Sequence, residues 1–410
     1  MTELKCKSCG YEGLNRFLEL GNIPPVNAFI PENEIAFEKA YPLNLAYCPH
    51  CFLVQLEQIV PPEDLFRNYL HLSAGSQTNV KHLKEVADYL STKMGIDTTK
   101  KVLEIGSNDG TLLAFFKQHT QNVVGVDPAL NLKKVNEELG IDYVAEFFNT
   151  STASKIAKEK GKFDLIVALN VIPHTPDNID LLKAARIVLR DTGTLVMEGV
   201  YALETILNGE FDTIYHEHVY TFSLHSLLST FRMAGLRVVD VERISTQGGS
   251  LRVFAMKEEH AVPVSSSVTE LLKKEKEAGF ANEELYTSVG KKVTEYKARL
   301  RALLETEKKT HGKLIGLGAP ARGVVIMNYC SITPDDVDYI IDDTPLKIGK
   351  VAPGVHIPVK SWDALSSSDE KTFLLLSWNY KDHLVSKLQQ RVKKGRVIIP
   401  FPKLEVISFG

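Results

Sequence analysis

The middle of the chain consists of short, continuous apolar runs separated by polar segments with helical spacing. Runs of this length are typical of strands that are buried on both faces of a sheet. Before the first run, apolar residues of segment 79–95 recur every three or four positions, at Val80, Leu83, Val86 and Leu90, which predicts an amphipathic helix. Strands are predicted at 102–105, 123–126, 163–168 and 193–198. This alternation predicts an α/β domain with a doubly wound, parallel sheet.

The pattern changes after residue 235. Two strands are predicted at 236–241 and 250–256, with Gly248 and Gly249 as the turn between them. A long amphipathic helix is predicted over 281–310. A second series of strands then follows, at 314–318, 337–343, 373–377 and 396–399. It predicts a second α/β domain, of Rossmann type.

The N-terminal segment is distinguished by its cysteines. It has two C-x2-C pairs, Cys6 with Cys9 and Cys48 with Cys51. Two such pairs supply the four thiolates of a closed tetrahedral zinc site, so the predicted zinc is structural. A folded insert must connect the pairs, and the glycine and prolines of 20–26 predict a loop within it. His50 is a spare candidate ligand, and we expect it not to bind the metal.

A glycine loop follows the first central strand. Its pattern is E-x-G-x3-G, formed by Glu104, Gly106 and Gly110. Gly106 lets the backbone turn and approach a ligand closely, and Asn108 or Asp109 can cap the next helix. Asp127 ends the following strand, where an acid can bind both hydroxyls of a ribose. The spacing departs from the G-x-G-x2-G of dinucleotide sites and suits S-adenosylmethionine (SAM), which has no pyrophosphate to hold.

Four titratable side chains stand in a row at Tyr215, His216, Glu217 and His218. They cannot all be buried without partners, because an unpaired polar group costs about 1–3 kcal/mol inside a protein. Histidine titrates near neutral pH and is a common general base, so catalysis is one interpretation. The alternatives are a solvated loop or a metal site formed by the two histidines. If the row is extended, His216 and His218 share one face; if it turns, this argument lapses.

Further polar residues follow the later strands of the central sheet. Asn170 and His174 follow one strand, and Glu198 ends the next. Ligands of doubly wound sheets lie beyond the carboxyl ends of the strands, so we expect these residues in one cleft with Gly106 and Asp127. The titratable row comes soon after Glu198 and is expected at the mouth of that cleft. A capping Asn and a surface His are the alternatives for the first two.

Two other segments carry candidate binding residues. The polar residues after Tyr69, including His71, either line a pocket or form a surface turn. In the C-terminal domain, the glycines at 316 and 318 lack a third glycine at the dinucleotide offset, which leaves an NAD site as a weak alternative. Arg322 favours a phosphate contact, because its guanidinium is a forked donor beside a predicted helix N-terminus.

Composition narrows the class of partner. The chain has 410 residues, for which two or three domains of about 150 residues are expected. Its 48 basic and 51 acidic residues give a formal charge of −3 and no electrostatic case for nucleic acid or an acidic membrane. No apolar run approaches the roughly 18 residues of a membrane span, and no signal segment is recognised. We expect a cytoplasmic protein, in which metal ligands or free thiols are commoner than disulfides.

Taken together, these features resemble the nucleotide-sugar C-methyltransferases, SAM-dependent enzymes that place branching methyl groups on deoxysugars. The resemblance covers nearly the whole chain. Its most specific segments are the two cysteine pairs and residues 103–113, 211–218 and 318–323. It implies a zinc-binding module at 1–65, a class I methyltransferase domain with a Rossmann-like sheet at 66–260, and a helical linker with a C-terminal Rossmann-like domain at 261–410.

The resemblance also implies roles for individual residues. His218 looks like the base, Tyr215 and Glu217 its companions, and Asn170 and His174 lie near the chemistry. An imidazole poised near pH 7 is a stronger base than an exposed carboxylate near pH 4, which favours His218 over Glu217. The implied cofactor-binding residues are Glu104, Gly106, Asn108, Gly110, Asp127, Glu146, Phe147 and Asn170. The implied substrate-binding residues are Tyr69, His71, Glu198, His216 and Arg322.

The implied substrate is a nucleoside-diphosphate 4-keto-6-deoxysugar. Its C3 proton, next to the ketone, is acidic enough for a base to remove if the enolate oxygen is stabilised, and C3 then attacks the methyl group in line. The chain departs from the family at Leu169, Pro173 and His71, so the exact sugar is open. We favour a monomer.

Three other functions are alternatives. A SAM-dependent O- or N-methyltransferase would need a base but no enolate. An NAD-dependent oxidoreductase would use the C-terminal domain, and the glycine spacing argues against it. A non-catalytic zinc module would recruit partners, and the titratable row argues against that.

Overall fold

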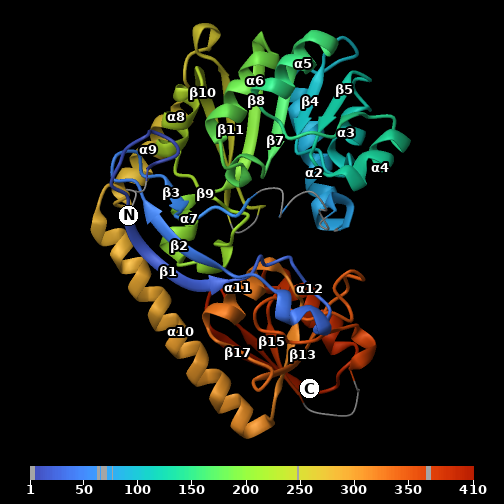
Figure 1. Cartoon of the computed structure of the whole chain (residues 1–410), viewed down its shortest axis with the longest axis vertical. Coiled ribbons are helices and arrows are strands. Elements are labelled where there is room, and N and C mark those ends of the chain that lie inside the picture. The colour runs from blue at the N-terminus through green and yellow to red at the C-terminus, as the bar shows by residue number, and fades with distance from the viewer. Residues whose placement is uncertain (1–4, 62–64, 66–71, 76, 247–248, 366–370) are drawn as a thin grey trace.

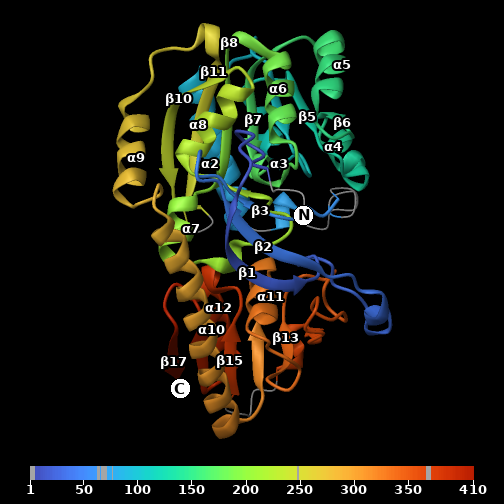
Figure 2. The same ribbon diagram turned by 60° about the vertical axis from the view of Figure 1, so that its left-hand side comes forward.

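The computed structural model describes residues 5–61, 65, 72–75, 77–246, 249–365 and 371–410. Three sheets follow one another along the long axis of the molecule (Figure 1). The smallest lies between the two larger ones, and a second view shows the same order (Figure 2). Within the described ranges, no helix combines the length and the apolar character needed to cross a membrane.

The smallest sheet is antiparallel, with the order β1-β2-β3-β9. Its strands are β1 (Asn15–Ile23), β2 (Tyr41–Tyr47), β3 (Val54–Leu56) and β9 (Tyr220–Thr221), and the 3-10 helix η1 (Glu32–Phe37) follows β1. The expected folded insert between the cysteine pairs is therefore confirmed. The expected loop at 20–26 is wrong for its first four residues, which belong to β1. The sheet tolerates Gly21 at an irregularity in the β1–β2 pairing, and Pro24 and Pro25, which lack an N–H, follow the strand.

The central sheet has the order β10-β11-β8-β7-β4-β5-β6, in which β11 runs antiparallel to both neighbours. The strands are β4 (Val102–Ile105), β5 (Val123–Val126), β6 (Asp142–Val144), β7 (Phe163–Leu169), β8 (Leu189–Val200), β10 (Leu236–Ile244) and β11 (Ser250–Lys257). The inner strands are buried on both faces, which explains their continuous apolar runs.

Helices cover both faces of the central sheet. On one face α2 (Gln77–Met94) and α3 (Thr111–Phe116) pack in a core that contains Val102 of β4. On the other face α5 (Thr150–Lys160), α6 (Asn178–Val188) and α8 (Leu224–Met233) pack in a core that contains Leu103. Alternate residues of one strand thus face opposite cores, and the predicted doubly wound sheet is confirmed. The remaining helices of this region are α4 (Lys133–Glu138) and α7 (Ala202–Asn208).

The helices α9 (Ser266–Glu277) and α10 (Glu283–His311) connect the central sheet to the C-terminal sheet, and α10 runs along one side of the molecule (Figure 1). The C-terminal sheet has the order β14-β13-β12-β15-β16-β17 and is parallel except for β17. Counted along the chain, this is the 3-2-1-4-5-6 order of Rossmann sheets, so the prediction of a second Rossmann-type domain is confirmed. Its elements are β12 (Leu314–Leu317), α11 (Ala321–Tyr329), β13 (Val337–Ile341), β14 (Val359–Lys360), β15 (Lys371–Leu375), α12 (Lys381–Gln389), β16 (Gly395–Ile399) and β17 (Glu405–Phe409).

Candidate active site

The titratable row lies in a turn between the 3-10 helix η5 (Phe211–Thr213) and β9. The backbone N–H of His218 donates to the carbonyl of Tyr215 at 2.8 Å, which closes the turn. Because the row is a turn and is not extended, strand geometry gives no reason for His216 and His218 to share one face. The two histidines contact different partners: His216 Nε2 lies 3.3 Å from the carbonyl of Tyr41 in β2, whereas His218 contacts Tyr215 and His174.

His218 is held in one tautomer by its neighbours. Its Nδ1 lies 2.6 Å from the carbonyl of Thr213, which can only accept, so Nδ1 carries the proton and Nε2 carries the lone pair. The ring centre lies 4.0 Å from that of Tyr215 and 4.8 Å from that of His174. A cavity of about 10 Å³, enough for one water molecule, adjoins these groups. It is lined by Asn170, Pro173, His174, Val200, Thr213, His218, Tyr220 and Thr221.

Burial sets the protonation states of this cluster. It lowers the pKa of His218 to about 4, and the bond to Thr213 opposes the shift. The pKa of His174 is likewise lowered well below its usual value by burial, with a contribution from His218. Burial raises the pKa of Tyr215, so its hydroxyl stays protonated at neutral pH. Both expectations behind the choice of His218 over Glu217 need correction: the imidazole is not poised near pH 7, and the carboxylate is not exposed, since Glu217 is 5% accessible.

The other two members of the row contact the smallest sheet. Glu217 accepts a hydrogen bond from Nδ2 of Asn27 at 2.5 Å. His216 uses Nε2 toward Tyr41, and its buried Nδ1 has no hydrogen-bond partner among the described residues. Burial also lowers the pKa of His216. Neither Asn27 nor Tyr41 was predicted from the sequence, because nothing local links them to residues about 180 positions away.

Arg322, in α11, reaches the site from the C-terminal domain. Its guanidinium lies 2.9 Å from Glu210, 3.4 Å from Asp212 and 3.0 Å from the side-chain oxygen of Asn379. It also lies over the ring of Trp378, whose Nε1 donates to Asp212 at 2.7 Å. The residue expected to contact phosphate is thus already paired with two buried carboxylates. Through them it joins α11 to the segment that leads into the titratable row.

The glycine loop turns as expected. Gly106 has φ +70°, and a Cβ there would lie 2.4 Å from Cγ2 of Val171, so only glycine fits between the two loops. Gly110, with φ +79°, is the N-cap of α3. Of the two expected caps, Asp109 accepts from the first N–H of that helix at 3.2 Å, whereas Asn108 accepts from the backbone N–H of Ser73.

Three carboxylates gather around this loop. Asp127 accepts from the backbone N–H groups of Asn108 and Ala129, at 3.0 and 2.9 Å. Burial raises the pKa of Glu104 well above its usual value, and the charges of Asp127 and Asp109 add to the shift. Glu104 Oε2 is buried and has no hydrogen-bond partner in the described part of the chain. An acidic, partly unsatisfied loop of this kind suits a ligand that carries positive charge.

Asn170 directly follows β7, and its backbone N–H donates to the carbonyl of Glu198 in the neighbouring strand β8 at 2.8 Å. Asn170 lines the small cavity with φ +56°. Glu198 is not among the described residues that line it. Its carboxylate is buried and accepts from Arg252 at 2.7 Å, with His82 of α2 at 2.9 Å. No local pattern predicts these partners, which come from β11 and α2.

The remaining candidates are Glu146, Phe147, Tyr69 and His71. Glu146 is exposed and accepts from Oγ1 of Thr152 at 3.0 Å, and half-buried Phe147 follows it. Tyr69 and His71 lie outside the described residues.

The four cysteines form one cluster, as predicted. Sγ of Cys6 lies 3.6 Å from that of Cys51, Sγ of Cys9 lies 3.6 Å from that of Cys48, and all four lie within 4.8 Å of one another. Thiolates that bind one tetrahedral zinc ion at about 2.3 Å stand about 3.8 Å apart, so the cluster fits the metal. His50 is exposed and stacks on the ring of Tyr11.

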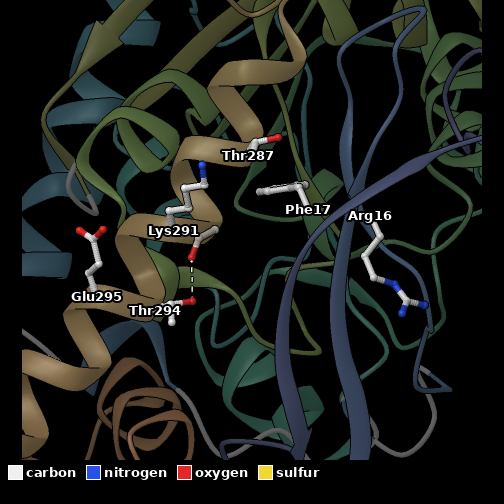
Figure 3. Close-up of a pocket in the computed structure, with 7 residues that line it drawn as sticks. Arg16, Phe17, Thr287, Lys291, Thr294 and Glu295 are labelled. Carbon is white, nitrogen blue, oxygen red and sulfur yellow. Dashed lines mark hydrogen bonds between the residues drawn. The ribbon is translucent and has the colours of Figure 1, made fainter.

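A larger groove lies away from this chemistry. It has a volume of about 490 Å³ and is lined by residues of β1 and α10, including Phe17, Lys291 and Glu295 (Figure 3). It is open to solvent, and no member of the titratable row or the glycine loop lines it. We therefore place the candidate active site at the smaller cavity, where the polar groups converge.

The comparisons with known proteins agree on the class of enzyme. Residues 6–66 match the family model described as "Putative zinc binding domain", residues 77–241 match "Methyltransferase domain", and residues 245–402 match "C-methyltransferase C-terminal domain". C-methyltransferase NovU from Streptomyces niveus is 31% identical over 406 residues, which cover 98% of this chain and 97% of that protein.

More distant likenesses cover only the central region. A ubiquinone biosynthesis O-methyltransferase from Actinobacillus pleuropneumoniae serotype 7 is 29% identical over 114 residues, or 26% of this chain and 49% of that protein. The structure of magnesium protoporphyrin IX methyltransferase from Synechocystis PCC 6803 with bound SAH has a TM-score of 0.34 and 14% identity, covering 43% of this chain and 83% of that one. The match to NovU spans almost the whole of both proteins, and the chain therefore belongs to the family of SAM-dependent C-methyltransferases with a class I methyltransferase fold.

Proposed function

We propose that this C-methyltransferase methylates C3 of a nucleoside-diphosphate 4-keto-6-deoxysugar after base-catalysed formation of an enolate. The observation that carries the proposal is the state of His218: a neutral imidazole, protonated at Nδ1, beside a protonated Tyr215 and next to the cavity lined by Asn170 and His174. A neutral base and a hydroxyl donor placed together are what proton removal next to a ketone requires.

In this proposal Nε2 of His218 takes the C3 proton. The Nδ1–H bond to the carbonyl of Thr213 persists and stabilises the imidazolium that forms. Tyr215 donates a hydrogen bond to the developing enolate oxygen. Because the pKa of His218 is depressed, the ring is a weak base by itself, and most of the driving force comes from stabilising the enolate. Glu217 orients the site, and Asn170 and His174 complete the pocket.

SAM supplies the electrophilic methyl group when it is bound. Its sulfonium and ammonium groups are cationic, which fits the acidic glycine loop and the oxygen of Glu104 that has no partner within the described ranges. Asp127 is the proposed ribose ligand. The full proposed cofactor set is Glu104, Gly106, Asn108, Gly110, Asp127, Glu146, Phe147 and Asn170.

The proposed substrate contacts come from several parts of the chain. They are Tyr69, His71, Glu198, His216 and Arg322. Glu198 and Arg322 are paired within the chain, so contact with substrate would require either residue to share or exchange its partners. We propose the division into residues 1–65, 66–260 and 261–410, with one structural zinc held by the four cysteines of the first part.

Mass-spectrometric screening of 4-keto nucleotide sugars with SAM tests the substrate. The expected result is a product heavier by one methylene, with the new carbon attached to C3 in the NMR spectrum. Methyl transfer to oxygen or nitrogen, or to none of the 4-keto sugars, would contradict the proposal. Metal analysis of the purified protein and of Cys48→Ser tests the zinc: we expect one zinc per chain, and its loss with misfolding in the variant. A zinc-free chain that folds normally would contradict the structural role.

A further inference from the structure

The smallest sheet holds the titratable row at several points. The backbone N–H of Leu56 donates to the carbonyl of Val219 at 2.9 Å, and β3 pairs with β9 directly after the row. His216 contacts the carbonyl of Tyr41 in β2. The first two contacts fix the backbone directly after the row, and the third holds one imidazole of the row. One further contact differs from them, because it reaches a carboxylate within the row.

That contact is the hydrogen bond from Nδ2 of Asn27 to Oε1 of Glu217, at 2.5 Å. Asn27 lies in a tight turn after β1, in which the N–H of Ala28 donates to Pro25 and the N–H of Phe29 donates to Asn27. Val26 and Phe29 on either side are buried, at 1% and 5% exposure. The amide is therefore presented from a rigid support. A donor of this kind stabilises and orients an ionised carboxylate.

Glu217 lies where three parts of the molecule meet. Its charge reaches two titratable neighbours: after burial, it is the largest contributor to the raised pKa of Tyr215, and it opposes the burial that lowers the pKa of Lys347. Lys347, from the C-terminal domain, donates to the carbonyl of Ala319 at 2.8 Å and lies over the ring of Phe29. A shift of the Glu217 carboxylate would therefore alter the surroundings of Tyr215.

We propose that Asn27 is a positioning residue of the catalytic centre, whose amide fixes the Glu217 carboxylate beside Tyr215 and so makes the zinc-binding module a working part of the methyl-transfer site. The inference rests on the proposed role of the titratable row. It assigns to the module a task beyond holding a metal ion. Asn27 acts through Glu217, and the consequence of losing it should appear in turnover more than in SAM affinity.

The first test needs no substrate. The titration of Glu217 is followed by NMR in the full-length zinc-loaded protein with carboxyl-labelled glutamate. The signal of Glu217 is assigned as the one that is missing in Glu217→Gln. Asn27→Ala should move the midpoint of Glu217 to higher pH, because the donor that favours the charged form is gone. Asn27→Asp should move it further, because a second carboxylate opposes ionisation. Asn27→Gln, which keeps an amide donor, should stay closer to wild type. An unmoved midpoint in all three variants would overturn the inference.

The second test measures turnover with a matched control. Ser8 is a buried residue of the same module whose hydroxyl bonds Thr230 of α8 at 2.6 Å, so Ser8→Ala also removes a hydrogen bond across this interface. Asn27→Ala should lower kcat on the order of 100-fold with the KM for SAM nearly unchanged, and Asn27→Gln should recover part of it. Ser8→Ala should retain kcat within a few-fold. Equal losses in Asn27→Ala and Ser8→Ala would overturn the inference.

The two tests separate this inference from the proposed substrate. A wild-type enzyme that methylates no 4-keto sugar would count against the proposed function, and the titration of Glu217 would still decide whether Asn27 controls that carboxylate.

Discussion

The central sheet and the C-terminal sheet carry the same turn in two different electrostatic settings. Gly106 and Gly318 each follow the first strand of their sheet with φ of +70° and +78°, and each donates its N–H across the sheet at 2.7 Å. In each sheet an aspartate directly follows the next strand along the chain, Asp127 after β5 and Asp342 after β13. Asp127 accepts two backbone N–H groups, and so does Asp342, at 2.6 and 2.7 Å. The backbone alone does not distinguish the two sites.

The side chains around the two turns do distinguish them. The first turn has Glu104 and Asp109 near Asp127, and one oxygen of Glu104 has no hydrogen-bond partner among the residues that the structure describes. The second turn has Lys347 on the carbonyl of Ala319, and Arg322 at the start of the following helix. Acidic surroundings favour a cationic ligand. At the second turn the charges offset one another, because Arg322 is paired with Glu210 and Asp212. The same backbone turn thus lies among different charges in the two sheets.

The largest expected effect comes from removing Arg322 near the second turn. Arg322→Ala leaves Glu210 and Asp212 buried without their partner, which should cost about 3 kcal/mol of unfolding free energy. Arg391→Ala, which removes a cation over the ring of Trp362 in the same domain, is the control and should cost well under 1 kcal/mol. Urea denaturation measures both. Where Arg322→Ala folds, the KM for the nucleotide sugar should rise more than that for SAM; a change in neither KM nor stability would show that the guanidinium has no such role.

A smaller effect should separate the two acids. Asp127→Asn should weaken SAM binding about 10- to 100-fold, because a hydrogen bond to a charged group contributes about 1.5–3 kcal/mol. Asp342→Asn makes the same change at the matched position and should leave SAM affinity within two-fold. Calorimetry measures the affinity of both variants for SAM and for NADH, and we expect NADH to bind neither variant. Tight binding of NADH without binding of SAM would reverse the assignment of the two turns.

The smallest effect is a pH dependence of stability that comes from His218, in the turn between η5 and β9. Burial lowers the pKa of His218 to about 4, below the 6.5 or so of an unfolded chain. A depressed pKa contributes stability that is present above pH 6.5 and is lost as the pH falls toward 4. Between pH 8 and pH 6 the loss should be about 1 kcal/mol, and His218→Phe should remove that part of the dependence. Equal losses in wild type and variant, by urea denaturation, would mean that His218 titrates normally.

Local patterns in the sequence predicted the elements well. The apolar runs identified the buried strands, and the glycine with its following acid identified the first turn, because both depend on neighbours along the chain. Segment 20–26 was predicted as a loop from its glycine and prolines, yet β1 continues to Ile23 because β2 supplies hydrogen bonds that the sequence does not reveal.

The geometry of the site could not be predicted in the same way. The turn at Tyr215–His218 depends on Asn27 and Tyr41, and Glu198 is held by Arg252 and His82 from distant elements. The depressed pKa of His218 follows from burial by tertiary packing, which residue spacing does not specify. The sequence thus indicated candidate residues, and the tertiary contacts determined their partners and protonation states.

The central claim is that His218 removes the C3 proton, and hydrogen exchange tests it apart from methyl transfer. The enzyme is incubated with the keto-sugar and the demethylated product of SAM in heavy water, and the C3 signal is followed by NMR. Wild type should exchange the C3 proton, whereas His218→Ala should lose both exchange and methylation while binding SAM normally. Exchange at the wild-type rate in His218→Ala would contradict the account and make Glu217 the first residue to test as the base.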